Sequence, residues 1–216
     1  GLIVVGGALS MYISTIQGST NVTNSARLNH DIDSVMQLMT NDIRRAGYWG
    51  GAVTNSDARN NSFTQTTTTI QIRNVAAPTT AVNSGNCILY TYDADMDGVV
   101  DSDEYYGFRL NGVELEMRIT GTAATASSCG VNAQWNNIVN ENKVSISTLT
   151  FSNANYKCFN ASANTTCTVT ALVAGNQAVE TRQIDISLIG NVLNDATVDK
   201  ELTGIVKVRN NRVYEQ

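Results

Sequence analysis

Residues 1–50 read GLIVVGGALSMYISTIQGSTNVTNSARLNHDIDSVMQLMTNDIRRAGYWG, and this stretch decides the fold. Residues 1–26 carry no charged side chain, and the first part of them is almost continuously apolar. From residue 27 onward, apolar side chains recur at helical spacing between charged and polar ones: Leu28, Ile32, Val35, Met36, Met39, Ile43 and Ala46. The stretch predicts one helix of more than about 40 residues that ends near Gly47. This helix would be apolar on all sides over residues 1–26 and amphipathic over residues 27–50.

An alternative interpretation divides this stretch into two helices, one of them a buried core helix, joined by residues 18–25. The apolar run is a few residues shorter than the roughly 20 that a membrane-spanning helix needs. A signal peptide would begin with a segment containing Lys or Arg, whereas this sequence opens inside the apolar run. We therefore expect the run to continue a longer apolar helix that begins upstream of Gly1.

Residues 51–216 lose the helical period and predict a β-rich globular domain. Asn111 and Gly112 are typical of a type I′ hairpin turn, and the strand after them is expected to have one solvated face. The predicted fold class is α+β, with the long N-terminal helix packed on an antiparallel sheet of about seven strands in two sections. β-Branched, aromatic and alternating apolar runs predict strands at residues 66–72, 87–92, 105–110, 113–119, 144–151, 167–173, 183–189 and 204–209.

Four cysteines permit three disulfide pairings. Pairing between sequence neighbours is the most economical: Cys87 with Cys129, and Cys158 with Cys167. Each bond would stabilise the fold by roughly 2–4 kcal/mol. A zinc site is the competing interpretation, but no two cysteines have the C-x2-C spacing and the lone His30 lies on the distant helix. Oxidised cysteines indicate the periplasm or the cell exterior.

The formal net charge is -5, and one short segment accounts for it. Residues 93–104 read DADMDGVVDSDE and hold six acidic side chains; without them, 13 acidic residues face 14 Lys and Arg. Lys and Arg form no cluster anywhere in the sequence, so binding to the nucleic-acid backbone has no electrostatic basis. The sequence also lacks the nucleophile-elbow, zinc-protease and phosphate-loop patterns, and we expect no enzyme.

The same acidic segment matches every position of the twelve-residue calcium loop D-x-[DN]-x-[DN]-G-x5-E, with Gly98 at the sharp turn. Carboxylates this crowded repel one another unless a divalent cation lies between them, and hard oxygen ligands suit Ca²⁺. Predicted strands flank the loop, so we expect a structural ion and no helix-opening switch. Asp103 is not an expected ligand. The expected ligands are Asp93, Asp95, Asp97, the carbonyl of Val99, Asp101 and Glu104.

Three segments of the chain resemble the PilW-type minor pilins of bacterial type IV pili: GLIVVGGALSMYIST, LMTNDIRRAGYWGG and the closing IVKVRNNR. They are also similar to the J-type minor pseudopilins of type II secretion. Members of these families begin with a peptidase-cleaved, methylated residue and carry a membrane-embedded Glu a few residues later. This sequence shows neither feature, so we expect it to be a fragment that lacks the first residues.

The resemblance implies a structural subunit that helps to initiate pilus assembly at the pilus tip. It implies that residues 1–26 anchor the subunit in the inner membrane and later pack in the pilus core, while residues 51–216 form the outward-facing pilin domain. The implied partners are other minor pilins and the major pilin, reached through the N-terminal helix, and a tip adhesin. The implied location is the inner membrane and periplasm before assembly and the extracellular pilus tip afterwards, with roles in cell adhesion and twitching motility.

Three alternatives stay open at the level of sequence. The first is a minor pseudopilin of type II secretion. The second is a membrane-anchored, calcium-stabilised exported hydrolase that uses carboxylates alone, which would need a deep pocket with two carboxylates outside residues 93–104. The third is a calcium-dependent adhesin or glycan-binding module.

Overall fold

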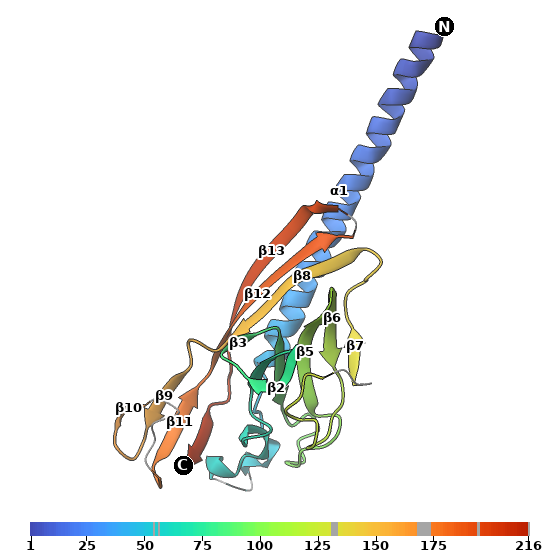
Figure 1. Cartoon of the computed structure of the whole chain (residues 1–216). Helices are drawn as coiled ribbons and strands as arrows, with labels where there is room; N and C mark the ends of the chain where they lie inside the picture. The colour runs from blue at the N-terminus through green and yellow to red at the C-terminus, as the bar shows by residue number, and fades with distance from the viewer. Residues whose placement is uncertain (54, 56, 131–133, 168–173, 194, 216) are drawn as a thin grey trace.

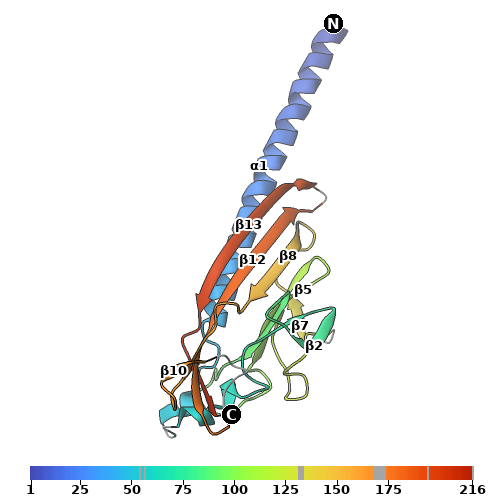
Figure 2. The ribbon, with the colours of Figure 1, turned by 60° about the vertical axis from the view of Figure 1, so that its left-hand side comes forward.

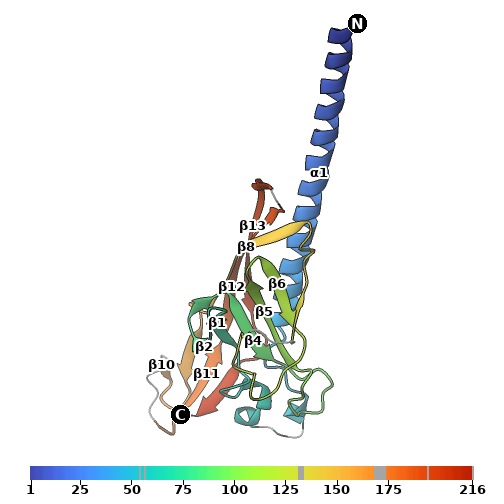
Figure 3. The same ribbon diagram turned by 45° about the vertical axis from the view of Figure 1, so that its right-hand side comes forward.

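The computed structural model describes the chain except for residues 54, 56, 131–133, 168–173, 194 and 216 (Figure 1). One helix, α1 (Leu2–Ile43), runs for 42 residues without a break, so the two-helix alternative is wrong. Its N-terminal part extends away from the rest of the molecule in every view (Figure 1, Figure 2, Figure 3). After Ile43 the chain turns toward Gly47, close to the predicted end.

Among the described residues, no helix is both long enough and apolar enough to cross a membrane.

The described part of the β domain forms three antiparallel sheets, where the sequence predicted two sections. The first has the order β2 (Ala77–Ala81), β1 (Gln71–Asn74), β4 (Cys87–Thr91), β5 (Tyr105–Asn111), β6 (Glu114–Arg118) and β7 (Trp135–Asn137). The second has the order β13 (Asp195–Lys207), β12 (Gln183–Val192), β8 (Val144–Ser152) and β3 (Ser84–Gly85). The third has the order β10 (Thr165–Cys167), β9 (Lys157–Asn160), β11 (Gln177–Thr181) and β14 (Arg212–Glu215). Three short 3-10 helices follow α1: η1 (Gly50–Val53), η2 (Ala58–Asn60) and η3 (Ser62–Thr64).

The amphipathic half of α1 packs on β12 and β13. Its predicted apolar stripe is buried from Leu28 to Ala46. Two glycines let the backbones come close: a Cβ on Gly190 would lie 2.3 Å from Cδ1 of Ile32, and one on Gly204 would lie 2.9 Å from Sδ of Met36. The helix and this sheet therefore share one core, as the apolar period predicted.

Most of the predicted strands overlap strands of the structure. Residues 87–92, 105–110, 144–151, 183–189 and 204–209 fall on β4, β5, β8, β12 and β13, and the last two strands are longer than predicted. Of the predicted strand at residues 167–173, Cys167 ends β10, and residues 168–173 lie outside the described residues. Six described strands were not predicted: β2, β3, β7, β9, β11 and β14.

The predicted strand at residues 66–72 is wrong over its first part, because residues 66–69 form a turn and β1 begins at Gln71. The hydroxyl of Thr68 donates to the carbonyl of Ser62 at 2.6 Å and accepts from the N–H of Gln65 at 3.1 Å. These side-chain bonds to the backbone compete with strand pairing, which β propensity alone does not reveal.

The predicted hairpin turn is shifted by one residue. Asn111 pairs with Glu114, so Gly112 and Val113 form the two-residue loop. Gly112 has a φ of +67°, whereas Asn111 does not have the positive φ that a type I′ turn needs.

The solvated face expected for the strand after this turn is also wrong. Glu116 and Arg118 are both buried, and Nε of Arg109 donates to Oε2 of Glu116 at 2.5 Å. The cause is a loop that covers this face: Arg118 donates to the carbonyl of Thr125, and Arg109 donates to the carbonyl of Cys129. Alternation of apolar and charged residues cannot reveal a covering segment that comes later in the chain.

Candidate metal centre

Residues 93–104 connect β4 to β5, and three acidic residues of this loop form a cluster. Carboxylate oxygens of Asp93, Asp95 and Asp97, here called the acidic cluster, all lie within 4.8 Å of one another. Asp95 and Asp97 also shape the loop, since their Oδ1 atoms accept from the N–H groups of Asp97 at 3.1 Å and of Val99 at 2.7 Å. Gly98 has a φ of +83° at the predicted turn position. Positions 1, 3 and 5 of the predicted calcium loop are thus gathered at one place.

Asp93 is the buried member of the cluster, with 1% of its surface exposed. Its Oδ2 accepts two backbone N–H groups, from Gly50 at 2.7 Å and from Gly98 at 3.0 Å. Its Oδ1 is buried and has no hydrogen-bond partner among the described residues. A carboxylate oxygen without a partner in a buried place costs free energy unless a cation or donor reaches it. The geometry therefore fits a bound cation.

Glu104 closes the loop from its far end. It is 2% exposed, and its two oxygens accept the N–H groups of Ala94 at 2.6 Å and of Asp101 at 3.0 Å. Burial raises the pKa of Glu104, the two backbone N–H groups lower it, and the charges of Asp93 and Asp95 raise it again. Glu104 is therefore near enough to the cluster to feel its charge, although it is not one of the three grouped carboxylates.

Asp101 and Val99 complete the predicted ligand set. Loss of hydration raises the pKa of Asp101, and the charges of Asp97, Asp95 and Asp103 add to the rise. The Val99 side chain has no polar atom, so only the backbone carbonyl of this residue can bind an ion. Carboxylate and carbonyl oxygens are the ligands that Ca²⁺ prefers. The attraction of each carboxylate to a bound cation would offset the mutual repulsion of the carboxylates.

The loop is attached to the segment that follows α1. The N–H of Asp93 donates to the carbonyl of Tyr48 at 3.0 Å, next to the bond between Gly50 and Oδ2 of Asp93. Gly98 lies so close that an added Cβ would be 3.3 Å from both Gly51 and Trp49. An ordered conformation of residues 93–104 therefore fixes the position of the C-terminal end of α1 relative to the first sheet.

Both disulfides join sequence neighbours. Cys87 of β4 pairs with Cys129, 42 residues later, with 6.4 Å between their Cα atoms. Cys158 of β9 pairs with Cys167 of β10, 9 residues later, with 5.0 Å between their Cα atoms. The first bond ties the loop that contains Thr125 and Cys129 to the first sheet. The second bond closes the β9–β10 hairpin.

The chain thus consists of a long helix packed on a β domain that contains two disulfides. The family model described as prepilin peptidase-dependent protein B matches residues 21–208.

The chain belongs to the prepilin peptidase-dependent protein B family. It is therefore a pilin-like, exported protein related to type IV pili, from a structural family. No curated protein and no solved structure matches it.

This pilin-like chain also contains a buried polar joint that sequence reasoning missed. Asp42 of α1 accepts the hydroxyl hydrogens of Tyr90 at 2.5 Å and Tyr92 at 2.9 Å. Arg45 donates to the Tyr92 hydroxyl at 3.1 Å and lies over that ring. Burial and the charge of Asp42 raise the pKa of Tyr90 well above its usual value. No local pattern links Asp42 to tyrosines 48 and 50 residues away, so only the fold brings them together.

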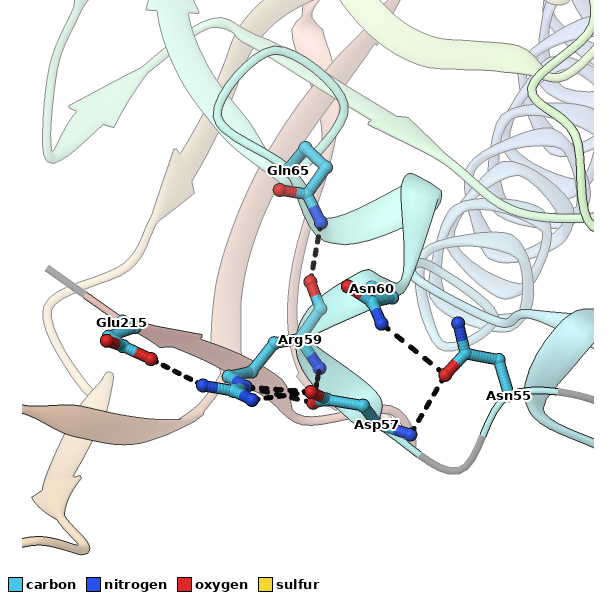
Figure 4. Close-up of polar contacts among 6 residues, drawn as sticks. All are labelled: Asn55, Asp57, Arg59, Asn60, Gln65 and Glu215. Carbon is cyan, nitrogen blue, oxygen red and sulfur yellow. Dashed lines mark hydrogen bonds and ion pairs between the residues drawn. The ribbon is translucent and has the colours of Figure 1, made fainter.

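A hollow of about 550 Å³ contains two carboxylates outside the acidic loop, Asp57 and Glu215. Figure 4 shows that the guanidinium of Arg59 lies between them and bonds both. Hydrogen bonds from Arg59 lower the pKa of Asp57 to about 2. This arrangement is an ion pair that ties η2 to β14. It is not an acid/base pair of the kind that the hydrolase alternative requires.

Proposed function

We propose that this member of the prepilin peptidase-dependent protein B family is a minor pilin that helps to initiate type IV pilus assembly at the pilus tip. We further propose that residues 93–104 hold a structural Ca²⁺. Residues 1–26 would serve as the membrane and pilus-core half of the helix, residues 27–50 as its amphipathic half, and residues 51–216 as the displayed pilin domain.

The observation that carries the assembly proposal is the exposed apolar half of α1. Large apolar side chains that are exposed together on one helix are unfavourable in water and indicate a protein partner or a membrane. A lipid bilayer before assembly and neighbouring pilin helices afterwards would both cover it. The exposed large side chains are Val4, Val5, Leu9, Met11, Tyr12, Ile13, Ile16 and Val22.

The calcium proposal rests on Asp93, whose buried Oδ1 has no partner among the described residues and whose carboxylate belongs to the acidic cluster. Asp93, Asp95, Asp97, Asp101, Glu104 and the Val99 carbonyl would bind the ion. Because Asp93 also holds Gly50, the ion would brace the junction between α1 and the first sheet. The ion supplies positive charge, and no chemical step is assigned to it.

A clean deletion of the gene in the organism that carries it tests the assembly proposal. We expect surface pili, counted by electron microscopy, to be lost or sharply reduced, and twitching motility and adhesion to fall with them. Complementation with the intact gene should restore the count. Normal piliation, with no other initiator to compensate, would contradict the proposal. Normal piliation together with loss of protein secretion would favour the pseudopilin alternative.

A further inference from the structure

A second hollow lies where the end of α1 meets the last part of the chain. It measures about 410 Å³, and its walls include Tyr48, Trp49, Asn55, Asn61, Asn210 and Asn211. Segments more than 150 residues apart in the sequence, at residues 47–49 and 210–211, meet there. All the described residues that line the hollow come after Ile43, the last residue of α1. We call it the Tyr48 hollow.

The chemistry of the Tyr48 hollow is aromatic and amide. Of the described residues that line it, none carries a charge: they are two aromatic residues, four asparagines and three small residues. A charged ligand would find no counter-ion there, and a wholly apolar ligand would leave the amides without partners. The lining therefore selects for a neutral ligand that has both an apolar face and hydrogen-bonding groups.

The walls of the hollow are held in place by bonds within the protein. The Trp49 ring lies against the backbone of Gly51, where an added Cβ would come within 2.3 Å of its Nε1. Asn61 donates to the carbonyl of Gly47 at 2.9 Å, and Asn210 donates to the carbonyl of Ala46 at 3.2 Å. Fixed walls reduce the entropy that a ligand loses when it binds.

Several polar groups of the hollow remain free for a ligand. Oδ1 of Asn55 accepts from the N–H of Asp57 at 3.1 Å and from Nδ2 of Asn60 at 3.4 Å. Its own Nδ2 therefore points away from that network, as Figure 4 shows. In the described part of the chain, the Asn55 Nδ2, the Asn211 amide and the Tyr48 hydroxyl have no hydrogen-bond partner. These three groups line the same hollow and together offer both donors and acceptors.

We propose that the Tyr48 hollow binds a neutral saccharide. A sugar ring presents an apolar C–H face that can stack on an aromatic side chain, and its hydroxyls donate and accept at once. Tyr48 supplies the exposed ring, and Asn55 and Asn211 bond the hydroxyls. The site goes beyond an assembly role, and its lining includes neither the carboxylates of the acidic loop nor the apolar half of α1.

The test is isothermal titration calorimetry of the full chain, kept in solution with a detergent that has no sugar headgroup. The probes are maltohexaose, cellohexaose and the fully N-acetylated chitohexaose, all neutral, each at up to about 10 mM. We expect at least one probe to bind with a Kd between about 10 μM and 1 mM. Tyr48→Ala and Asn211→Ala should each weaken that binding at least about tenfold. Both residues are exposed, so neither change should alter the melting temperature.

Tyr12→Ala and Asn136→Ala are the matched controls, because they remove an exposed tyrosine and an exposed asparagine that lie outside the hollow. Both should bind like the unaltered protein. The proposal is overturned if none of the three probes binds. It is also overturned if neither Tyr48→Ala nor Asn211→Ala weakens binding. The same holds if the two control substitutions weaken binding as much as the two substitutions in the hollow.

Discussion

The carboxylate of Asp93 connects the segment after α1 to the acidic loop. One oxygen holds the N–H of Gly50, just after α1, and the N–H of Gly98, inside the acidic loop. The other oxygen is buried without a partner among the described residues. Burial without compensation is unfavourable for an ionised group, so the residue gains most from an added cation. We therefore expect the response of the loop to calcium to depend more on Asp93 than on the neighbouring acidic residues.

Asp93→Asn should abolish the response of the protein to calcium. In the unaltered protein we expect millimolar Ca²⁺ to raise the melting temperature by about 5–10 °C over chelator, as for an ion at roughly 100 times its Kd. The variant keeps a side-chain oxygen for Gly50 but loses the charge that the ion needs. Thermal melts with calcium and with chelator measure both proteins.

Asp103→Asn is the matched control, because Asp103 lies in the same loop at a position that is not an expected ligand. It should keep the full calcium shift. Coincident melts of the unaltered protein with calcium and with chelator would refute the structural ion.

Arg59→Gln should return the pKa of Asp57 from about 2 toward 3.8, because it removes the hydrogen bonds and the charge that hold the value low. The folded pKa lies below the unfolded one. The pair therefore contributes stability above about pH 4, and this contribution is lost as the pH falls through about 2. Carboxyl NMR titration measures the change. An unchanged pKa in the variant would mean that Arg59 is not the cause.

At the scale of elements, the packing of α1 on the β12–β13 hairpin stabilises the domain. Ile32→Ala should lower the free energy of unfolding by about 2–5 kcal/mol, because Ile32 is 0% exposed and lies over Gly190, where a cavity would open. Val22→Ala, on the same helix but 71% exposed, should change it by less than about 0.5 kcal/mol. Denaturant unfolding measures both. Equal effects would show that the helix does not pack as described.

The two disulfides should differ in what they contribute. Chain entropy predicts a loss of about 4 kcal/mol on replacing Cys87 and Cys129 by Ser, and of about 2.5 kcal/mol on replacing Cys158 and Cys167, because the first bond closes the longer loop. Denaturant unfolding of the two double variants gives the order. A larger loss from the short loop would contradict this account.

Sequence reasoning succeeded where the structure depends on neighbours along the chain. The helix period from Leu28 to Ala46 and the strands with apolar alternation are local signals. The acidic run at residues 93–104 is also a local signal, and three of its aspartates are grouped, but the calcium ion stays a prediction. Sequence reasoning failed where distant segments decide. Glu116 is buried because a later loop covers its strand, and residues 66–69 turn because Thr68 bonds to Ser62 and Gln65. The Asp42 joint and the Tyr48 hollow also form only when remote segments meet.

At the scale of the whole molecule, the excess negative charge and half of the described exposed large apolar side chains lie on different segments. Six acidic residues of the loop at residues 93–104 account for the net charge of -5, and the rest of the chain is almost neutral. Of the 16 exposed large apolar side chains among the described residues, 8 lie at residues 4–22 of α1. A subunit of this design would use its apolar helix for assembly and present a nearly uncharged domain outside.

The number of surface pili made by helix variants tests the central claim most directly. Ile13 on α1 and Val113 in the β5–β6 turn are similarly exposed, at 51% and 55%. A deletion strain would be complemented with Ile13→Asp or with Val113→Asp, at equal protein levels by immunoblot. A charge within an apolar helix costs about 2.5–3.5 kcal/mol in a bilayer. We therefore predict that Val113→Asp restores pili and that Ile13→Asp does not. Full piliation with Ile13→Asp would contradict a role for this helix in assembly.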